Sequence, residues 1–135
     1  MLSDRTRALL EQSAFAKLTT LDADGAPQMT VMWYRLAGDE LRMIAPASAV
    51  KARHLARDPR AAVIVDAPGD GYTYVELRCR AEVVHDDAAA RRELREVAAR
   101  YVGERADAFV AGLSADPRVL LVLRPERVRE HFSEE

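Results

Sequence analysis

The residues best suited to chemistry lie in segment 45–60, where a predicted strand runs directly into a predicted helix. Lys51 falls in the first turn of that helix, which itself contains no acidic residue. Backbone N–H groups at a helix N-terminus are unpaired and attract anions, whereas a positive side chain there is unfavourable unless an anion offsets it. The pattern favours a phosphate or carboxylate site at Lys51, with the Ser48 hydroxyl as a further donor. A solvated cationic face of Lys51, Arg53 and Arg57 explains the same residues equally well.

Two pairs of aromatic residues offer a second candidate site. Trp33 and Tyr34 lie near the end of one predicted strand, and Tyr72 and Tyr74 lie at the start of another. Aromatic side chains at the mouth of a small barrel could form the walls of a flat apolar pocket. Ordinary core packing is the better explanation for at least half of them.

Nucleophilic and metal chemistry find little support in this sequence. Ser48 and Cys79 have no convincing base and do not lie in the Gly-x-Ser-x-Gly context of an activated serine. His54, His85 and His131 lack the spacing of metal ligands, and His54 is interpreted as a packing or surface residue. We therefore expect no catalytic side chain and no metal site.

Length and charge narrow the class of protein further. The chain has 135 residues, 20 Lys+Arg against 22 Asp+Glu and a formal charge of −2, which predicts a single domain over residues 1–135. A near-neutral surface argues against nucleic-acid binding, and no apolar run approaches the roughly 20 residues that cross a bilayer. The N-terminal segment lacks the features of a signal peptide. We expect a cytoplasmic protein with neither a nucleic-acid nor a membrane partner.

The elements that must position these residues follow from periodicity and turn signals. Alternating residues and turn clusters predict an antiparallel meander, followed by a helix, two strands, a helical excursion and one or two final strands. The predicted helices cover 4–13, 46–57 with Ser48 as N-cap, a segment from Asp86 to Gly103, and 106–113. The predicted strands cover 15–21, 28–35, 41–45, 61–66, 72–84, 119–123 and 128–132, with Pro125 separating the last two. Six or seven mainly antiparallel strands favour a small barrel with helices outside.

A series of short motifs, in order along the chain, adds a family resemblance. These motifs are FAKLTTLDADGAPQ at 15–28, VMWY at 31–34, VKARHLARDPR at 50–60, YVELR at 74–78 and RVLLVLRPERV at 118–128. Together they resemble the pyridoxamine 5′-phosphate oxidase-like split-barrel superfamily. More narrowly, they are similar to its actinobacterial class that uses the deazaflavin coenzyme F-420. The resemblance implies a mainly β fold with flanking helices, a six-stranded antiparallel split β-barrel that forms a homodimer with cofactor sites between the subunits.

The resemblance also implies which residues contact the cofactor. The positions matching Gln28, Thr30, Met32, Ile44 and Ala45 lie against the tricyclic ring in similar proteins. The positions matching Val50, Lys51, Ala52, Arg53 and His54 hold the phosphate, with Lys51 as the main charge. Tyr74 would approach the cofactor from the fifth strand. This resemblance agrees with the anion site that the residues themselves predict at Lys51 and Ser48.

The implied activity is hydride transfer from reduced coenzyme F-420 to an unsaturated or quinone-like small molecule, with the cofactor supplying the redox chemistry. Arg53, Arg57 and Arg60 are available for the acidic tail of the deazaflavin, which favours it over flavin mononucleotide (FMN). An FMN-dependent reductase or oxidase of the same fold is the alternative enzyme. A non-catalytic protein that carries a flavin, haem or F-420 is the alternative outside the enzyme class.

Overall fold

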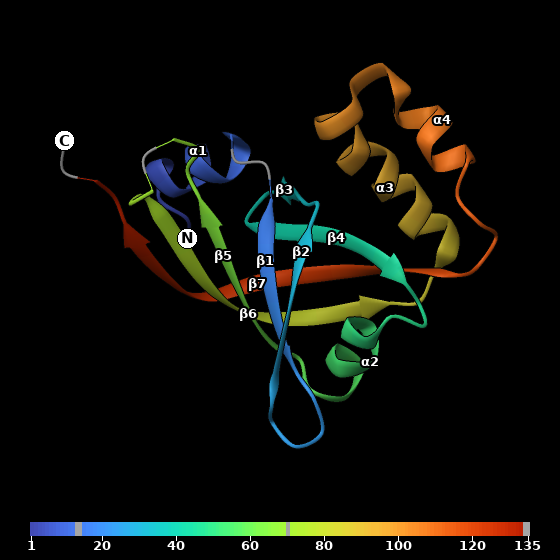
Figure 1. Ribbon diagram of the computed structural model, residues 1–135, viewed down its shortest axis with the longest axis horizontal. Helices are drawn as coiled ribbons and strands as arrows, with labels where there is room; N and C mark the ends of the chain where they lie inside the picture. The colour runs from blue at the N-terminus through green and yellow to red at the C-terminus, as the bar shows by residue number, and fades with distance from the viewer. Residues whose placement is uncertain (13–14, 70, 134–135) are drawn as a thin grey trace.

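The computed structural model describes residues 1–12, 15–69 and 71–133, and the strands within them form one antiparallel sheet of seven. Their order is β2-β1-β5-β6-β7-β4-β3, so β2 and β3 are edge strands and the sheet is open between them. Figure 1 shows β1, β2 and β5 crossing the direction of β4 and β7, the curvature of a partly closed barrel. The bounds are β1 Ala16–Leu21, β2 Pro27–Met32, β3 Arg35–Ala37, β4 Glu40–Pro46, β5 Arg60–Asp66, β6 Tyr74–Val84 and β7 Arg118–His131.

Alternation along the strands separates an inner face, which forms the core, from an outer face. On β6, Val75, Leu77 and Cys79 are buried, whereas Tyr74, Arg78 and Arg80 are exposed. This confirms the predicted alternation of that strand. The core is completed by buried side chains from the other strands, among them Leu18, Met43, Val63, Val65, Leu121 and Leu123.

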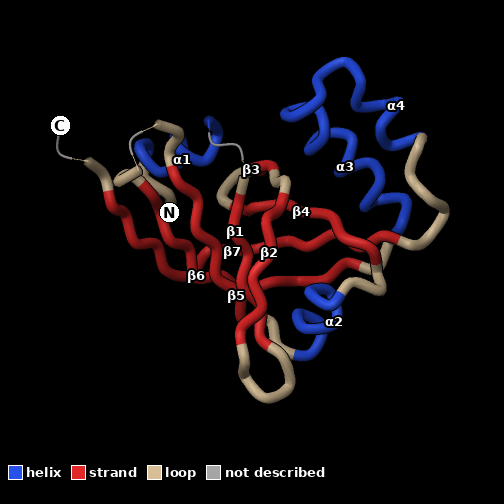
Figure 2. The backbone as a smooth tube through the Cα atoms, viewed as in Figure 1, coloured by secondary structure: helices blue, strands red, loops and turns tan. Residues whose placement is uncertain are grey.

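The helices flank this sheet in separate places, as Figure 2 shows. Helix α1 (Asp4–Gln12) lies by the chain termini, and α2 (Val50–Arg57) lies near the β1–β2 hairpin. Helices α3 (Asp87–Val102) and α4 (Ala106–Ala111), joined by a short 3₁₀ turn at Gly103–Arg105, pack together on another side. The described residues contain no helix with the length and apolar character that crossing a membrane requires.

The predicted start and end of α3 are confirmed. The Asp86 carboxylate accepts a hydrogen bond of 3.0 Å from the Ala89 backbone N–H, which makes Asp86 the N-cap. Gly103 ends the helix with φ of 57°, a conformation that side chains other than glycine rarely adopt. The predicted end of α1 at Ser13 lies outside the described residues.

The predicted break at Pro125 is wrong, because β7 runs through it. Pro125 lies opposite Cys79 on β6, and Arg127 lies opposite Arg78, so Glu126 is an extra residue on β7. This β-bulge accommodates the proline, which cannot donate a hydrogen bond to the sheet. The two predicted C-terminal strands are therefore one.

The predicted strand 28–35 is interrupted at Trp33 and Tyr34, which separate β2 from β3. The Tyr34 side chain is fully buried and its hydroxyl donates to the Leu10 carbonyl of α1. Trp33 stacks on Tyr101 of α3, with 4.4 Å between ring centroids. These two aromatic residues anchor the chain between elements, which is the packing role the sequence favoured for at least half of the aromatic residues. The implied six strands become seven because this segment forms two strands.

Candidate functional site

The first group of candidate residues lies on the inner face of β2, at the open edge of the sheet. Gln28, Thr30 and Met32 pair with Thr20, Leu18 and Ala16 of β1, respectively. Cross-strand partners share a face, and Leu18 and Ala16 belong to the core. The Gln28 and Thr30 side chains therefore project into the barrel beside the opening between β2 and β3.

Two polar atoms in this group are buried and unsatisfied. Gln28 Oε1 and Thr30 Oγ1 have no hydrogen-bond partner among the described residues. Most buried polar atoms in proteins are hydrogen-bonded, because an unmade bond costs about 1–3 kcal/mol. Unsatisfied atoms at an open sheet edge fit a ligand that offers them hydrogen bonds, as the polar edge of a flavin or deazaflavin ring would.

The start of α2 provides a cation without a counter-charge. Lys51 is half-buried and makes no hydrogen bond or ion pair with any described residue. Its burial disfavours the charged form and lowers the pKa of the ammonium group. No acidic residue lies in the first turn, and the N-cap residue is Ala49, which gives no side-chain hydrogen bond. The predicted N-cap role of Ser48 is therefore wrong, and its exposed hydroxyl does not bond the helix.

The side chains of Ala52 and His54 face the core. His54 is 9% exposed, and its Nδ1 lies 2.9 Å from Thr20 Oγ1. Their side chains point away from an external anion. The Ala52 backbone N–H lies among the free donors of the first turn and can still meet an anion, whereas His54 lies beyond that turn, where backbone N–H groups bond to carbonyls within the helix. His54 is a packing residue, one of the two roles expected of it, and it holds α2 against β1 beside Gln28, the partner of Thr20.

The first turn of α2 is linked to β2 through β1, because His54 bonds Thr20 and Thr20 pairs with Gln28. Lys51 lies three residues before His54 on the same helix, and such residues are neighbours on a helix surface. We refer to Gln28, Thr30, Ser48, Val50 and Lys51 as the α2 corner. Arg53, the next cation, is exposed and has no ion-pair partner among the described residues.

The two candidate residues on β4 face opposite sides. The Ala45 side chain is buried in the main core. Ile44 packs instead against a smaller cluster of Ala90, Leu120 and Val122 beneath α3. The structure therefore does not bring Ile44 and Ala45 to one surface.

Tyr74 lies apart from the α2 corner of its own chain. It is on the outer face of the sheet, where it pairs with Asp66 at the far end of β5 from Arg60. Its ring stacks on His131 of β7, with 4.8 Å between centroids and an angle of 15°. The candidate residues are thus divided between an inner group at the opening and Tyr74 on the outer face.

Next to Tyr74, the outer face carries apolar side chains that were not predicted as functional. Met29 is 68% exposed and Val31 is 63% exposed on β2, and Ile64 is partly exposed on β5. Lys17 of β1 pairs with Val31 on one side and with Ile64 on the other, so the three side chains lie in a row on the same face of the sheet. We call Met29, Val31, Ile64 and Tyr74 the outer patch. The alternation of β2 placed Met29 and Val31 together, but whether that face was covered depended on the tertiary structure.

Cys79 has no nucleophilic role in this structure. Its side chain is buried beneath the outer face of β6. Burial, with a smaller contribution from Glu126, raises the pKa of the thiol to about 12, so it stays protonated near neutral pH.

Comparison with known families accounts for this architecture. The family model described as pyridoxamine 5′-phosphate oxidase matches residues 2–132, nearly the whole chain. The chain belongs to the pyridoxamine 5′-phosphate oxidase family. Within this family the mainly β fold with flanking helices is confirmed, in the form of an open antiparallel sheet of seven strands.

Solved structures place this family member among proteins of several kinds. An "F-420 reductase" shares 29% identity with a TM-score of 0.77, over 95% of this chain and 98% of that chain. A conserved hypothetical protein from Mycobacterium tuberculosis shares 27% identity with a TM-score of 0.81, over 97% of this chain and 85% of that chain. A haem storage protein from Vibrio cholerae shares 18% identity with a TM-score of 0.73, over 96% and 94%, which shows likeness of fold alone.

Proposed function

We propose that this protein is an oxidoreductase in which reduced coenzyme F-420 transfers a hydride to an unsaturated or quinone-like small molecule. The observation that carries the proposal is Lys51, a half-buried cation without an anionic partner in the acid-free first turn of α2. The unsatisfied atoms of Gln28 and Thr30 beside it support a polar ring as the ligand. The likeness to an F-420 reductase at 29% identity supports the choice of cofactor.

The residues of the α2 corner would bind and orient the cofactor. Lys51 and the first backbone N–H groups of α2, from Val50 to Ala52, would hold the phosphate. Gln28 and Thr30 would hydrogen-bond the polar edge of the ring, while Met32 excludes water from the same face. The bound cofactor supplies the hydride, so no acid–base side chain is required at this corner.

The same proposal includes a homodimer with the cofactor between its subunits. Tyr74 faces outward and lies away from the α2 corner of its own chain, so a second copy would bring it to the cofactor. The outer patch supports this arrangement, because apolar patches of this kind commonly mark interaction surfaces. Each site would then combine the α2 corner of one protomer with Tyr74 of its partner.

FMN is the second candidate cofactor, and one observation favours it. Of the arginines expected to meet an acidic tail, Arg57 donates to the Leu21 carbonyl and Arg60 pairs with Asp58. Lys51 and Arg53 are then the cations of this segment without such partners, which is enough for a single phosphate. A carrier without turnover would use the same residues.

A cofactor titration distinguishes these functions. Purified protein is titrated with coenzyme F-420 and, separately, with FMN, and binding is followed by the quenching of ligand fluorescence. We expect tighter binding of F-420, followed by oxidation of the reduced cofactor when menadione is added as a quinone acceptor. If FMN binds and F-420 does not, the assignment of F-420 as the cofactor is wrong. If F-420 binds but no quinone or enone of a test panel oxidises its reduced form, a carrier is favoured.

A further inference from the structure

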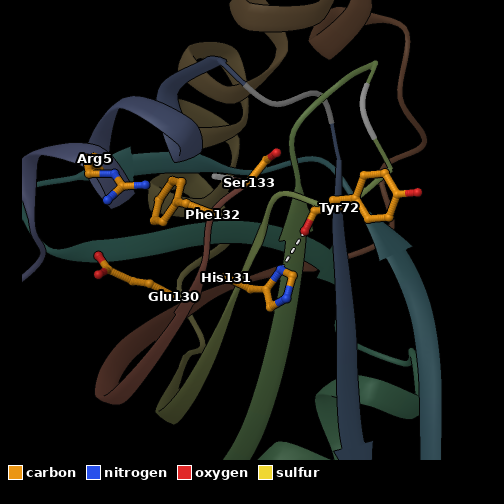
Figure 3. A pocket seen from close by; sticks show the side chains of 6 residues that line it. All are labelled: Arg5, Tyr72, Glu130, His131, Phe132 and Ser133. Carbon is orange, nitrogen blue, oxygen red and sulfur yellow. Dashed lines mark hydrogen bonds between the residues drawn. The ribbon is translucent and has the colours of Figure 1, made fainter. Parts of the chain in front are cut away.

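A cavity of about 580 Å³ lies between α1 and the end of β7. Figure 3 shows the side chains around it, which come from both ends of the chain and from the segment before β6. They are Arg5, Tyr72, Glu130, His131, Phe132 and Ser133. None of these residues belongs to the α2 corner, and the proposed function gives them no role.

Arg5 is the cation of this cavity. Its guanidinium carbon lies 3.9 Å from the centroid of the Phe132 ring, and Figure 3 shows the two groups side by side. Arg5 makes no hydrogen bond or ion pair with any described residue. A guanidinium that stacks on an aromatic ring keeps its N–H groups free at its edge, where they match the two oxygens of a carboxylate. The stacking also holds the side chain in place before a ligand arrives.

The carboxylate in the same cavity is already engaged elsewhere. Glu130 Oε2 accepts hydrogen bonds from the hydroxyls of Ser3 and Thr6 at the start of α1. These bonds lower the pKa of Glu130, which keeps it ionised, and Arg5 contributes at longer range. Glu130 therefore fixes the end of β7 to α1 and does not form an ion pair with Arg5.

His131 supplies a polar edge of fixed orientation. Its Nδ1 lies 2.6 Å from the Tyr72 carbonyl oxygen, so Nδ1 carries a proton and donates it. The ring stacks on Tyr74, which holds its plane. Nε2 then remains as a second polar atom of a flat ring that lines the cavity.

From these contacts we infer that this cavity binds a planar organic anion, with Arg5 holding the anionic group beside Phe132 and His131. A second cavity of about 350 Å³ shares Glu130 and His131 and is also lined by Tyr74. The anion site thus adjoins the residue that the proposed function brings to the cofactor. The anion would be the hydride acceptor if the proposed function holds, so that role rests on the proposed function. The inference that the cavity binds an anion does not depend on it.

The test compares two ligands of nearly the same shape, one charged and one neutral. 2-Naphthoate carries a carboxylate, and 2-naphthamide is its uncharged analogue. Binding of each to the purified full chain without cofactor is measured by isothermal titration calorimetry. We expect 2-naphthoate to bind at least about tenfold more tightly, with backbone amide NMR shifts at Tyr72 and Ser133. Equal affinities, or shifts confined to other residues, would overturn the inference.

Three variants locate the preference. Arg5→Gln removes the charge at similar length and should reduce the preference for 2-naphthoate to within about twofold, whereas Arg5→Lys should retain part of it. Arg92→Gln makes the same change at an exposed position of α3 and should leave the preference intact. An unchanged preference in Arg5→Gln would exclude this cavity as the binding site.

The same samples separate this inference from the proposed function. Coenzyme F-420 binding is measured on the native chain and on Arg5→Gln. Normal F-420 binding without a naphthoate preference overturns the anion site alone. A naphthoate preference without F-420 or FMN binding overturns the proposed function alone.

Discussion

Charged side chains are arranged differently beneath α3 and at the α2 corner. Beneath α3, the buried Glu93 accepts hydrogen bonds from Arg35 and Arg42, an arrangement that we call the α3 network. At the α2 corner, Lys51 has no such partner. The α3 network pairs its charges within the chain, with only the Arg42 Nε–H of this network left without a partner among the described residues, whereas the α2 corner leaves a whole charge for a ligand. Unpaired charge in a partly buried position therefore indicates function better than charge density does.

The largest expected loss of stability comes from a substitution that breaks the α3 network. Glu93→Ala removes the carboxylate and leaves Arg35 and Arg42 without it in a partly buried setting. Loss of one partner of a buried pair is strongly destabilising, and partial exposure of the two arginines reduces the cost to about 3 kcal/mol. Urea unfolding measures the change. The affinity for cofactor should stay the same, and a loss of less than about 1 kcal/mol would show that the network adds little.

The same network gives a dependence on pH. Burial opposes ionisation of Glu93, but the hydrogen bonds from Arg35 and Arg42 outweigh it and lower the pKa of the carboxyl from 4.5. A carboxyl whose pKa is lower in the folded state stabilises the protein above its unfolded pKa. That stability is lost as the pH falls from about 4.5 through the lowered value. Unfolding experiments across this range should show a steeper loss for the native chain than for Glu93→Ala.

At the α2 corner we expect a smaller effect, which lowers the affinity for cofactor and leaves the stability of the fold nearly unchanged. Lys51→Ala should weaken cofactor binding by about 1.5–3 kcal/mol, the range for a hydrogen bond to a charged group, while the stability of the fold hardly changes. Fluorescence titration measures the affinity and urea unfolding measures the stability. Arg92→Ala is the matched control. Normal cofactor affinity in Lys51→Ala would remove the anion site from this corner.

The outer patch tests the link between the α2 corner and Tyr74. Val31→Asp replaces an exposed apolar side chain by a charged one and should raise the dissociation constant of the proposed dimer at least about tenfold. Light scattering over a range of protein concentrations measures it. Arg92→Asp serves as the control for a surface charge change. A native chain that is monomeric at all concentrations would contradict the dimer and leave each α2 corner without a Tyr74.

The smallest expected change in stability comes from a comparison of the first residues of two helices, α3 and α2. Asp86→Ala should destabilise the protein by about 1 kcal/mol, because it removes the N-cap of α3. Ser48→Ala should cost almost nothing in stability, because Ser48 does not cap α2. Both are measured by urea unfolding. Equal losses for the two variants would show that the two helix starts do not differ as the structure indicates.

Local signals predicted the elements well where one residue type decides the structure. Asp86 and Gly103 set the limits of α3, and the Asp22 carboxylate fixes the turn between β1 and β2 by accepting from the Asp24 and Ala26 backbone N–H groups. Predictions failed where distant residues decide. Pro125 stays within β7 because a bulge at Glu126 lets β7 keep its pairing with β6. Trp33 and Tyr34 leave the sheet because α3 and α1 offer them partners.

The candidate site was predictable to a similar extent. Lys51 stood out because charge at a helix start can be read from the sequence alone. The separation of Tyr74 from Gln28 could not be read in this way, because the face of each strand follows from the closure of the sheet. Arg5 and His131 lie at opposite ends of the chain, so no local pattern joins them.

The last long strand also has a consequence for how the protein is made. β7 pairs with both β6 and β4, and Leu123 lies opposite Leu41, so the sheet joins segments far apart in the sequence. Pairings of this kind fold slowly, because a long loop must close before the contact forms. During synthesis, β4 and β6 keep unpaired edges until residues 118–131 have left the ribosome. A nascent chain at that stage exposes edges that favour aggregation, and release of β7 removes them.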